Sequence, residues 1–214
     1  EIARFVQEKQ RLVQLFARDN RALMQDYVSN LGDAVVYRQL AARVADYFPD
    51  HFTFALMDAE GRLLIDDFDG LIGELCLSDL HEFLETGRQR PRIHPHSEKY
   101  HFDVLAPLGA DAAQGVFFIS FHADILGRVL NAIQHPGHQL ILVYPESGDL
   151  IEVTADGARI NWMRDDYRIA LEEKRRILHR QPMPGTRWEV IDLHIPQLFE
   201  NYSRKLLGQS ALIF

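Results

Sequence analysis

Two segments of the chain, one in each half, share the same pattern of residues. Residues 55–65 and 142–152 each consist of an apolar stretch, a turn containing a glycine, and a second apolar stretch, and the two glycines, Gly61 and Gly148, occupy matching places. This pattern predicts a β-hairpin in each half, since glycine supplies the backbone conformation that a tight turn needs. The repetition predicts a chain built from two modules of related fold.

The first thirty residues contain no proline or glycine and predict a long helix over residues 2–31. Its apolar residues include Ile2, Phe5, Leu12, Phe16 and Leu23, at near-heptad spacing. Such a stripe fits a stalk or the seam of a homodimer, and it fits equally a helix that packs along its own domain. Both interpretations stay open at this point.

The remaining pattern predicts an α+β fold. Helices are expected at residues 34–48, with Asp33 as the N-cap, at 77–85 and at 124–133, and strands at 52–57, 62–66, 100–108 and 115–121. The second half is expected to hold its hairpin, a polar helix at 166–181, a strand at 186–193 and a terminal helix at 195–214. It therefore looks shorter than the first half by one strand.

These expectations divide the chain into four parts. Residues 1–50 form an N-terminal helical stalk or dimer region, 51–134 a first module, 135–194 a second, shorter module, and 195–214 a C-terminal helix that leads toward a membrane span. No run reaches the roughly 20 apolar residues that cross a bilayer. Helices at both ends are typical of a domain that lies between two membrane spans outside the segment.

Charge and cysteine content exclude several classes of protein. The formal net charge is -8 at pH 7, which argues against nucleic-acid binding because a binder needs a basic surface to replace phosphate counterions. The single cysteine, Cys76, excludes a disulfide framework and a zinc site built from cysteines, and its apolar neighbours suggest a small buried core residue. No cofactor motif is present, and we expect no cofactor and no metal.

Polar residues gather between positions 92 and 103. His94 and His96 alternate on one side of an extended segment, with His101 and Asp103 following in the same alternation, so a metal or anion site is conceivable. An exposed loop and strand with ordinary polar residues explains the pattern more simply. Arg92 lies just upstream and suits a carboxylate through paired hydrogen bonds.

Two further sets of residues carry weaker signals. Ser120, His122 and Asp124 share one side of an extended segment and resemble a nucleophile, base and orienting acid, but the glycine-flanked serine turn of hydrolases is missing. The acidic residues Asp66, Asp67 and Asp69 lack the spacing of a calcium loop. We expect no enzymatic activity.

Taken together, the chain resembles the extracytoplasmic double-Cache, or tandem PAS-like, sensor domains of bacterial transmembrane signalling proteins, above all those joined to cytoplasmic diguanylate cyclase (GGDEF) or phosphodiesterase modules. The resemblance is carried by the long first helix and by segments 56–63, 72–80, 100–104, 115–121, 150–154 and 185–190. The resemblance covers nearly the whole chain. The sequence departs from the family pattern in the second module, where a strand is expected to be missing.

The resemblance implies a periplasmic domain that binds a small molecule and passes the signal through its terminal helices to an output domain. It also implies a homodimer along residues 2–23 and a ligand pocket over residues 100–121. Polar contacts to a small-molecule ligand, with a carboxylate as a candidate group, are expected from the following residues: Arg92, His94, Tyr100, His101 and Asp103.

Two other functions remain as alternatives. The first is a cytoplasmic GAF- or PAS-like regulatory domain that binds a metabolite or nucleotide. The second is a small hydrolase that uses Ser120, His122 and Asp124.

Overall fold

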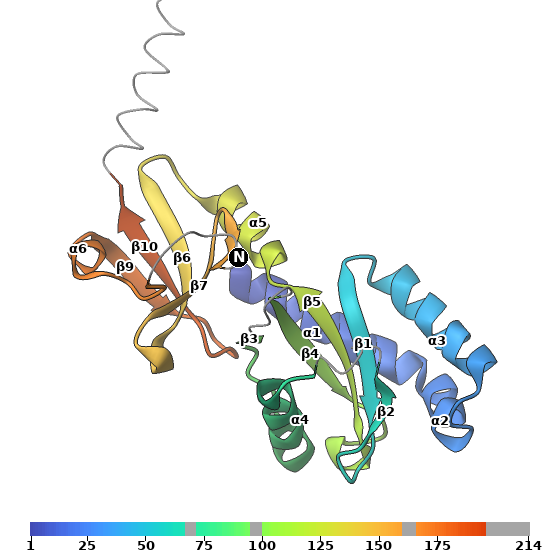
Figure 1. Ribbon diagram of the computed structural model, residues 1–214. Helices are drawn as coiled ribbons and strands as arrows, with labels where there is room; N and C mark the ends of the chain where they lie inside the picture. Colours follow the sequence, from blue (N-terminus) through green and yellow to red (C-terminus); the bar gives the residue numbers. More distant parts are fainter. Residues whose placement is uncertain (67–71, 95–99, 160–165, 196–214) are drawn as a thin grey trace, which may run out of the picture. The chain divides into compact units, whose positions relative to one another are not determined.

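In a computed structural model, the described part of the chain consists of two antiparallel five-stranded sheets and their covering helices (Figure 1). The structure describes residues 1–66, 72–94, 100–159 and 166–195. Contacts divide the chain into a first unit, Ala3–His122, and a second unit that comprises Ala123–Phe214 with Glu1–Ile2. The predicted α+β class is confirmed.

The first unit begins with three helices, α1 (Ile2–Asp19), α2 (Arg21–Ser29) and α3 (Ala34–Tyr47). The prediction of one unbroken helix over residues 2–31 was wrong, because the helix is interrupted at Asn20. The buried Asn20 side chain donates to the carbonyl of Phe16 and accepts a hydrogen bond from Arg43 at 2.6 Å. An asparagine that bonds locally to the backbone in this way competes with regular helix.

The apolar stripe of α1 packs inside the first unit. Val13, Phe16 and Ala17 are buried, whereas Leu12, which belongs to the heptad pattern, is 38% exposed. The stripe therefore serves as a core face of its own domain, one of the two interpretations that the sequence allowed. Asp33 caps α3 as predicted, since its carboxylate accepts from the backbone N–H groups of Val35 and Val36.

The first sheet has the strand order β2-β1-β5-β4-β3. Its strands are β1 (His51–Met57), β2 (Leu63–Asp66), β3 (Ile93–His94), β4 (His101–Pro107) and β5 (Val116–His122), and a short 3-10 turn, η1 (Ala112–Gln114), precedes β5. One face packs against α1 and α3, with Phe16 stacked on Phe117 and Tyr37 stacked on Phe54. Helix α4 (Glu74–Thr86) covers the opposite face.

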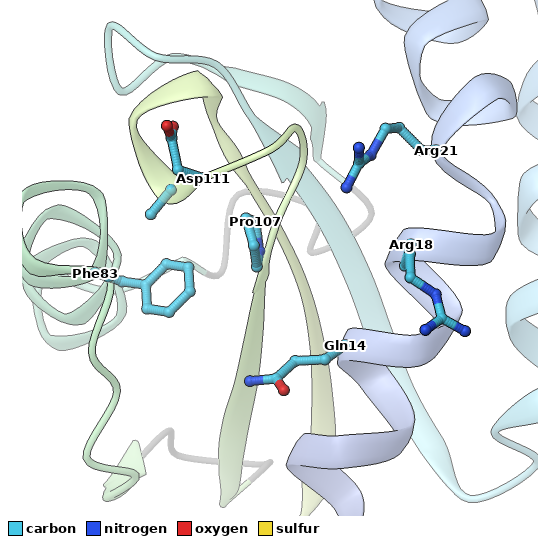
Figure 2. A pocket seen from close by; sticks show the side chains of 8 residues that line it. Gln14, Arg18, Arg21, Phe83, Pro107 and Asp111 are labelled. Atoms are coloured by element: carbon cyan, nitrogen blue, oxygen red, sulfur yellow. The ribbon is translucent and has the colours of Figure 1, made fainter.

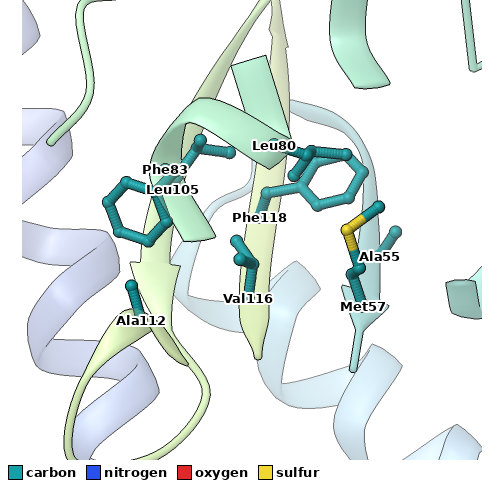
Figure 3. Close-up of a cluster of buried hydrophobic side chains, with 8 residues drawn as sticks. All are labelled: Ala55, Met57, Leu80, Phe83, Leu105, Ala112, Val116 and Phe118. Atoms are coloured by element: carbon teal, nitrogen blue, oxygen red, sulfur yellow. The ribbon is translucent and has the colours of Figure 1, made fainter. Parts of the chain in front are cut away.

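The face that α4 covers is apolar at one end and polar at the other. At the apolar end, Leu80 and Phe83 of α4 pack on Met57, Leu105 and Phe118 of the sheet (Figure 3). Every second residue of a strand points to this face. Along β4 and β5, the residues on this face therefore change from apolar, as at Leu105 and Phe118, to polar, as at Asp103 and Ser120. The apolar half fixes the helix on the sheet and thereby positions the polar half.

The second unit repeats this topology. It contains α5 (Asp124–Ile133), β6 (His138–Tyr144), η2 (Pro145–Ser147), β7 (Leu150–Thr154), β8 (Gly157–Ala158), α6 (Leu171–Lys174), β9 (Ile177–Pro182) and β10 (Glu189–His194). The order β8-β7-β6-β10-β9 places β7, β6, β10 and β9 as β2, β1, β5 and β4 are placed in the first sheet. Gly61 and Gly148 both have positive φ in the matching turns, as the repeat predicted.

The expectation that the second module lacks a strand was wrong. Residues predicted as a polar helix form a helix of four residues and then the edge strand β9, which pairs with β10. β9 is largely exposed and mostly polar after its first two residues, so its sequence resembles the solvent face of a helix. Its pairing partner, β10, lies further along the chain. The C-terminal helix expected at 195–214 lies, apart from Ile195, outside the described residues. Among the residues that are described, no helix combines the length and apolar character needed to cross a membrane.

Candidate functional site

The polar end of the α4-covered face is a row of buried side chains across three strands. Thr53 of β1 and Asp103 of β4 both pair with Ser120 of β5, so the three side chains lie side by side on the same face. All three are buried, and the Ser120 hydroxyl donates a hydrogen bond to Oδ1 of Asp103. The sheet therefore holds a carboxylate in its interior with one oxygen fixed.

Two histidines extend this row at the edge of the sheet. His94 of β3 pairs with His101 of β4, which brings the two rings to 5.3 Å between centroids in an edge-to-face arrangement. Each histidine is only 3% exposed. Asp103 Oδ2 lies 3.0 Å from Nδ1 of His94, and Asp103 Oδ1 lies 3.9 Å from Nε2 of His101. Both imidazoles therefore face the buried carboxylate.

Helix α4 adds a thiol to the cluster from above the sheet. The Cys76 Sγ atom lies 3.2 Å from Nδ1 of His94 and 3.6 Å from Nε2 of His101. Cys76 is 2% exposed, as expected for a core residue, but its sulfur contacts two ring nitrogens. Cys76 is therefore buried as predicted, but its surroundings are polar as well as apolar.

Asp79, one turn further along α4, supports the cluster from outside. Its Oδ2 lies 2.9 Å from Nε2 of His94, and Nη2 of Arg92 lies 2.7 Å from its Oδ1. Arg92 also donates through Nε to Oδ2 of Asp79 at 3.1 Å. The guanidinium that the sequence suggested for a ligand carboxylate thus already holds a carboxylate of the protein.

Burial and charge act against each other on the titration of the cluster. Burial alone lowers the pKa of His94, but the Asp103 charge and the contacts with Asp103, Asp79 and Cys76 hold this pKa well above its ordinary value. Burial raises the pKa of Asp103, but the charges of His94 and His101 and the Ser120 hydrogen bond keep it below its ordinary value. Burial raises the pKa of the Cys76 thiol. The groups stabilise one another's charged forms, except for the thiol.

The cluster has two chemical interpretations. The first is a nucleophilic cysteine activated by a neighbouring histidine. Such a cysteine needs a lowered pKa and access to a substrate, whereas Cys76 has a raised pKa and is buried. The alternative is metal binding. One donor atom from each of Cys76, His94, His101 and Asp103 lies within 4.8 Å of every other, which suits a single ion.

Of the ligand contacts expected from the sequence, the structure brings four together, namely Arg92, His94, His101 and Asp103. Tyr100 directly precedes β4 and is half-buried, and His96 lies outside the described residues. Sequence reasoning missed Asp79, and it did not connect Cys76 or Ser120 with the histidines. The spacing of three between Cys76 and Asp79, which puts them on one helix face, was the available signal.

The hydrolase interpretation of Ser120 has no support in the geometry. Ser120 is fully buried and its hydroxyl donates to Asp103, whereas the Asp124 carboxylate accepts from the backbone N–H of Ala158. A nucleophile without access to solvent cannot meet a substrate. Of the three acidic residues considered for calcium, Asp67 and Asp69 lie outside the described residues.

The first unit also contains a cavity of about 420 Å³, within the usual size range of small-molecule pockets (Figure 2). It lies beside the end of β4, with α1 on one side and α4 on the other. Its lining residues are Gln14, Arg18, Arg21, Phe83, Gly87, Pro107, Asp111 and Ala112.

The cavity combines charged groups of both signs with an apolar wall. The Nε atom of Arg21 is buried and has no hydrogen-bond partner among the described residues, whereas Arg18 is paired with Asp19. Phe83 and Pro107 supply apolar surface, and Asp111 supplies a carboxylate. A small molecule that bears a carboxylate would pair with the Arg21 guanidinium at the wall of the cavity.

Comparisons with known proteins identify the fold. No family model matches the sequence, and no curated protein matches it. Among solved structures, the chain is similar to the ligand-binding domain of the Pseudomonas aeruginosa PAO1 amino acid chemoreceptor PctB, solved in complex with L-Arg. The TM-score is 0.54 and the identity 12%, over 92% of this chain and 90% of that one.

A second match is the ligand-binding domain of the Pseudomonas fluorescens chemoreceptor CtaA, solved in complex with L-isoleucine, with TM-score 0.45 and 13% identity over 93% of this chain and 94% of that one. The match to PctB, together with the two sheets and the N-terminal helix, shows that the chain has the fold of chemoreceptor ligand-binding domains of the PAS-like, Cache type.

Proposed function

We propose that this chain is the ligand-sensing, extracytoplasmic part of a bacterial transmembrane receptor. The observation that carries the proposal is the fold, because two sheets of matching strand order follow a long N-terminal helix as in a chemoreceptor ligand-binding domain. The neighbour PctB is an amino acid chemoreceptor domain solved with L-Arg. Ligand binding in the first unit would favour one arrangement of the elements that lead to the membrane.

The ligand class follows from the cavity of the first unit. An α-amino acid carries a carboxylate for Arg21, an ammonium group for Asp111 and a side chain for the apolar wall of Phe83 and Pro107. We propose this class as the signal, in agreement with the carboxylate expected from the sequence. Within the set Arg92, His94, Tyr100, His101 and Asp103, the contacts of His94, His101 and Asp103 favour a metal ion instead.

The output of the receptor and its oligomeric state are further parts of the proposal. We propose a diguanylate cyclase or phosphodiesterase as the cytoplasmic output domain and a homodimer through the N-terminal helix.

The exposed Leu12 on α1 supports a dimer contact, although much of the apolar stripe packs inside the unit. Sedimentation of the chain at high concentration tests this contact, and a loss of dimer in Leu12→Glu is the expected result. A monomer at every concentration would contradict it.

A thermal-shift screen tests the ligand proposal, since a ligand that binds only the folded state raises the melting temperature. We expect a saturable shift with at least one amino acid, a loss of that shift in Arg21→Gln, and an unchanged shift in the control Arg11→Gln, whose arginine is exposed on α1 and paired with Glu8. A shift with nucleotides and none with amino acids would favour a cytoplasmic GAF- or PAS-like regulatory domain. Apolar spans of about 20 residues beside this segment in the gene would exclude that alternative.

A further inference from the structure

We propose that Cys76, His94, His101 and Asp103 bind one zinc ion in the interior of the first unit. The inference does not depend on the sensory function, because it rests only on the contacts between α4, β3 and β4. It assigns a role to the one cysteine of the chain and to three of the residues that the sequence singled out.

The distances between donor atoms match a tetrahedral zinc site. With zinc bonds of about 2.3 Å to sulfur and about 2.0–2.1 Å to nitrogen and oxygen, neighbouring donors lie roughly 3.3–3.6 Å apart. The sulfur of Cys76 lies 3.2 Å from Nδ1 of His94 and 3.6 Å from Nε2 of His101, and Oδ2 of Asp103 lies 3.0 Å from Nδ1 of His94. All four donor atoms lie within 4.8 Å of one another. Small shifts of side chains therefore suffice to close the coordination shell.

The donor atoms also have the electronic character that a cation needs. Oδ2 of Asp103 is buried and forms no hydrogen bond within the described part of the chain, although it lies 3.0 Å from Nδ1 of His94. A bound cation requires neutral His94, and in that form the Nε2 proton is directed at Asp79 and Nδ1 turns a lone pair toward the same point. Buried sulfur, nitrogen and carboxylate lone pairs that converge on one point require a cation, which is a proton on His94 in the metal-free cluster and a metal ion in the loaded one.

A zinc ion leaves this buried site without net charge. The thiolate of Cys76 and the carboxylate of Asp103 together balance the two positive charges of the ion, and the two histidines bind as neutral ligands. The cost of burying a divalent ion is therefore offset within the coordination shell.

The surroundings of the four donors resemble the outer shell of known zinc sites. A ligating histidine usually directs its second nitrogen to a carboxylate, and His94 does so with Asp79, which Arg92 holds in turn. The Ser120 hydroxyl fixes Oδ1 of Asp103 and leaves Oδ2 for the ion. These contacts orient the ligands before the ion arrives.

The donor set also indicates which ion binds and what it does. Sulfur and imidazole donors select zinc-like transition metals over magnesium and calcium, which prefer oxygen. Four protein donors, each buried, leave no open position for a substrate, so the ion is structural. It joins α4 to β3 and β4, beside the apolar packing of that helix on the sheet.

Metal content and cobalt spectra of the purified 214-residue chain test the proposal. We expect one zinc per chain after dialysis and, on exchange into Co²⁺, the intense visible bands of tetrahedral cobalt together with a thiolate-to-cobalt charge-transfer band. Cys76→Ser should abolish the charge-transfer band and His101→Gln should weaken metal binding at least tenfold. His81→Gln, which changes an exposed histidine on the same helix α4, should behave as the wild type.

A second measurement needs no variant. Removal of metal from the wild-type chain by a chelator should lower its melting temperature, and stoichiometric Zn²⁺, but not Mg²⁺, should restore it. Zinc and cobalt binding equal in wild type and Cys76→Ser, or a wild-type melting temperature that neither chelator nor zinc changes, would overturn the proposal. Either result leaves the amino-acid screen unaffected, so the two proposals fail independently.

Discussion

Replacement of Ser120 by alanine measures how strongly the sheet interior depends on its buried carboxylate. The serine hydroxyl donates to Oδ1 of Asp103, and both residues are almost completely buried. A hydrogen bond to a charged group contributes about 1.5–3 kcal/mol, and water cannot take its place in the variant. We therefore expect Ser120→Ala to lower the free energy of unfolding by about 1.5–3 kcal/mol in the presence of a chelator, which removes any effect of bound metal.

Urea unfolding followed by far-UV circular dichroism gives this free energy. Both tryptophans, Trp162 and Trp188, belong to the second unit, so an unchanged native emission spectrum shows that the second unit of the variant is intact. Ser78→Ala is the matched control, because Ser78 is exposed on α4 and its replacement should change stability by no more than about 0.5 kcal/mol. A Ser120→Ala variant as stable as this control would show that the hydrogen bond to Asp103 contributes no stability.

Three further predictions concern the scaffold. In Gly127→Ala, the new Cβ on α5 meets the Cα of Gly157 at 2.8 Å, so overpacking of about 1–3 kcal/mol should outweigh a helix-propensity gain of about 1 kcal/mol and lower the melting temperature. Asp33→Ala removes the cap of α3 and should cost about 1 kcal/mol in urea unfolding. Hydrogen bonds from Arg180 hold the pKa of Asp149 below its ordinary value, so the stability they provide is present above about pH 4 and lost as the pH falls through the folded-state pKa. The stability difference between wild type and Arg180→Gln should shrink correspondingly in acid, and a difference independent of pH would contradict this assignment.

The features of the fold that depend on local sequence could be predicted, and those that depend on distant pairing could not. The cap at Asp33, the turn at Gly61 and the apolar strand at residues 115–121 are local signals, and the structure confirms each of them. The edge strand β9 is defined by its pairing with β10, and its exposed side chains carry no periodicity that separates it from a helix. The break at Asn20 likewise depends on Arg43, which lies on another helix.

The candidate site shows the same division. The alternation of His101 and Asp103 along one strand indicated that the two share a face, and the register with β5 adds Ser120 to that face. Cys76 and Asp79 reach the histidines only because α4 is fixed on the sheet by the apolar packing around Leu80. A sequence pattern that shows one helix and one strand does not show that they meet, so the fourth donor of the metal site was missed.

Isothermal titration calorimetry with amino acids tests the sensory function most directly. We expect an amino acid to bind the wild-type chain saturably, with one site per chain. Binding to Arg21→Gln should be at least tenfold weaker, and binding to Arg11→Gln should be unchanged. Absence of heat with every amino acid, or equal affinity in wild type and Arg21→Gln, would contradict the proposal that the cavity beside β4 receives the signal.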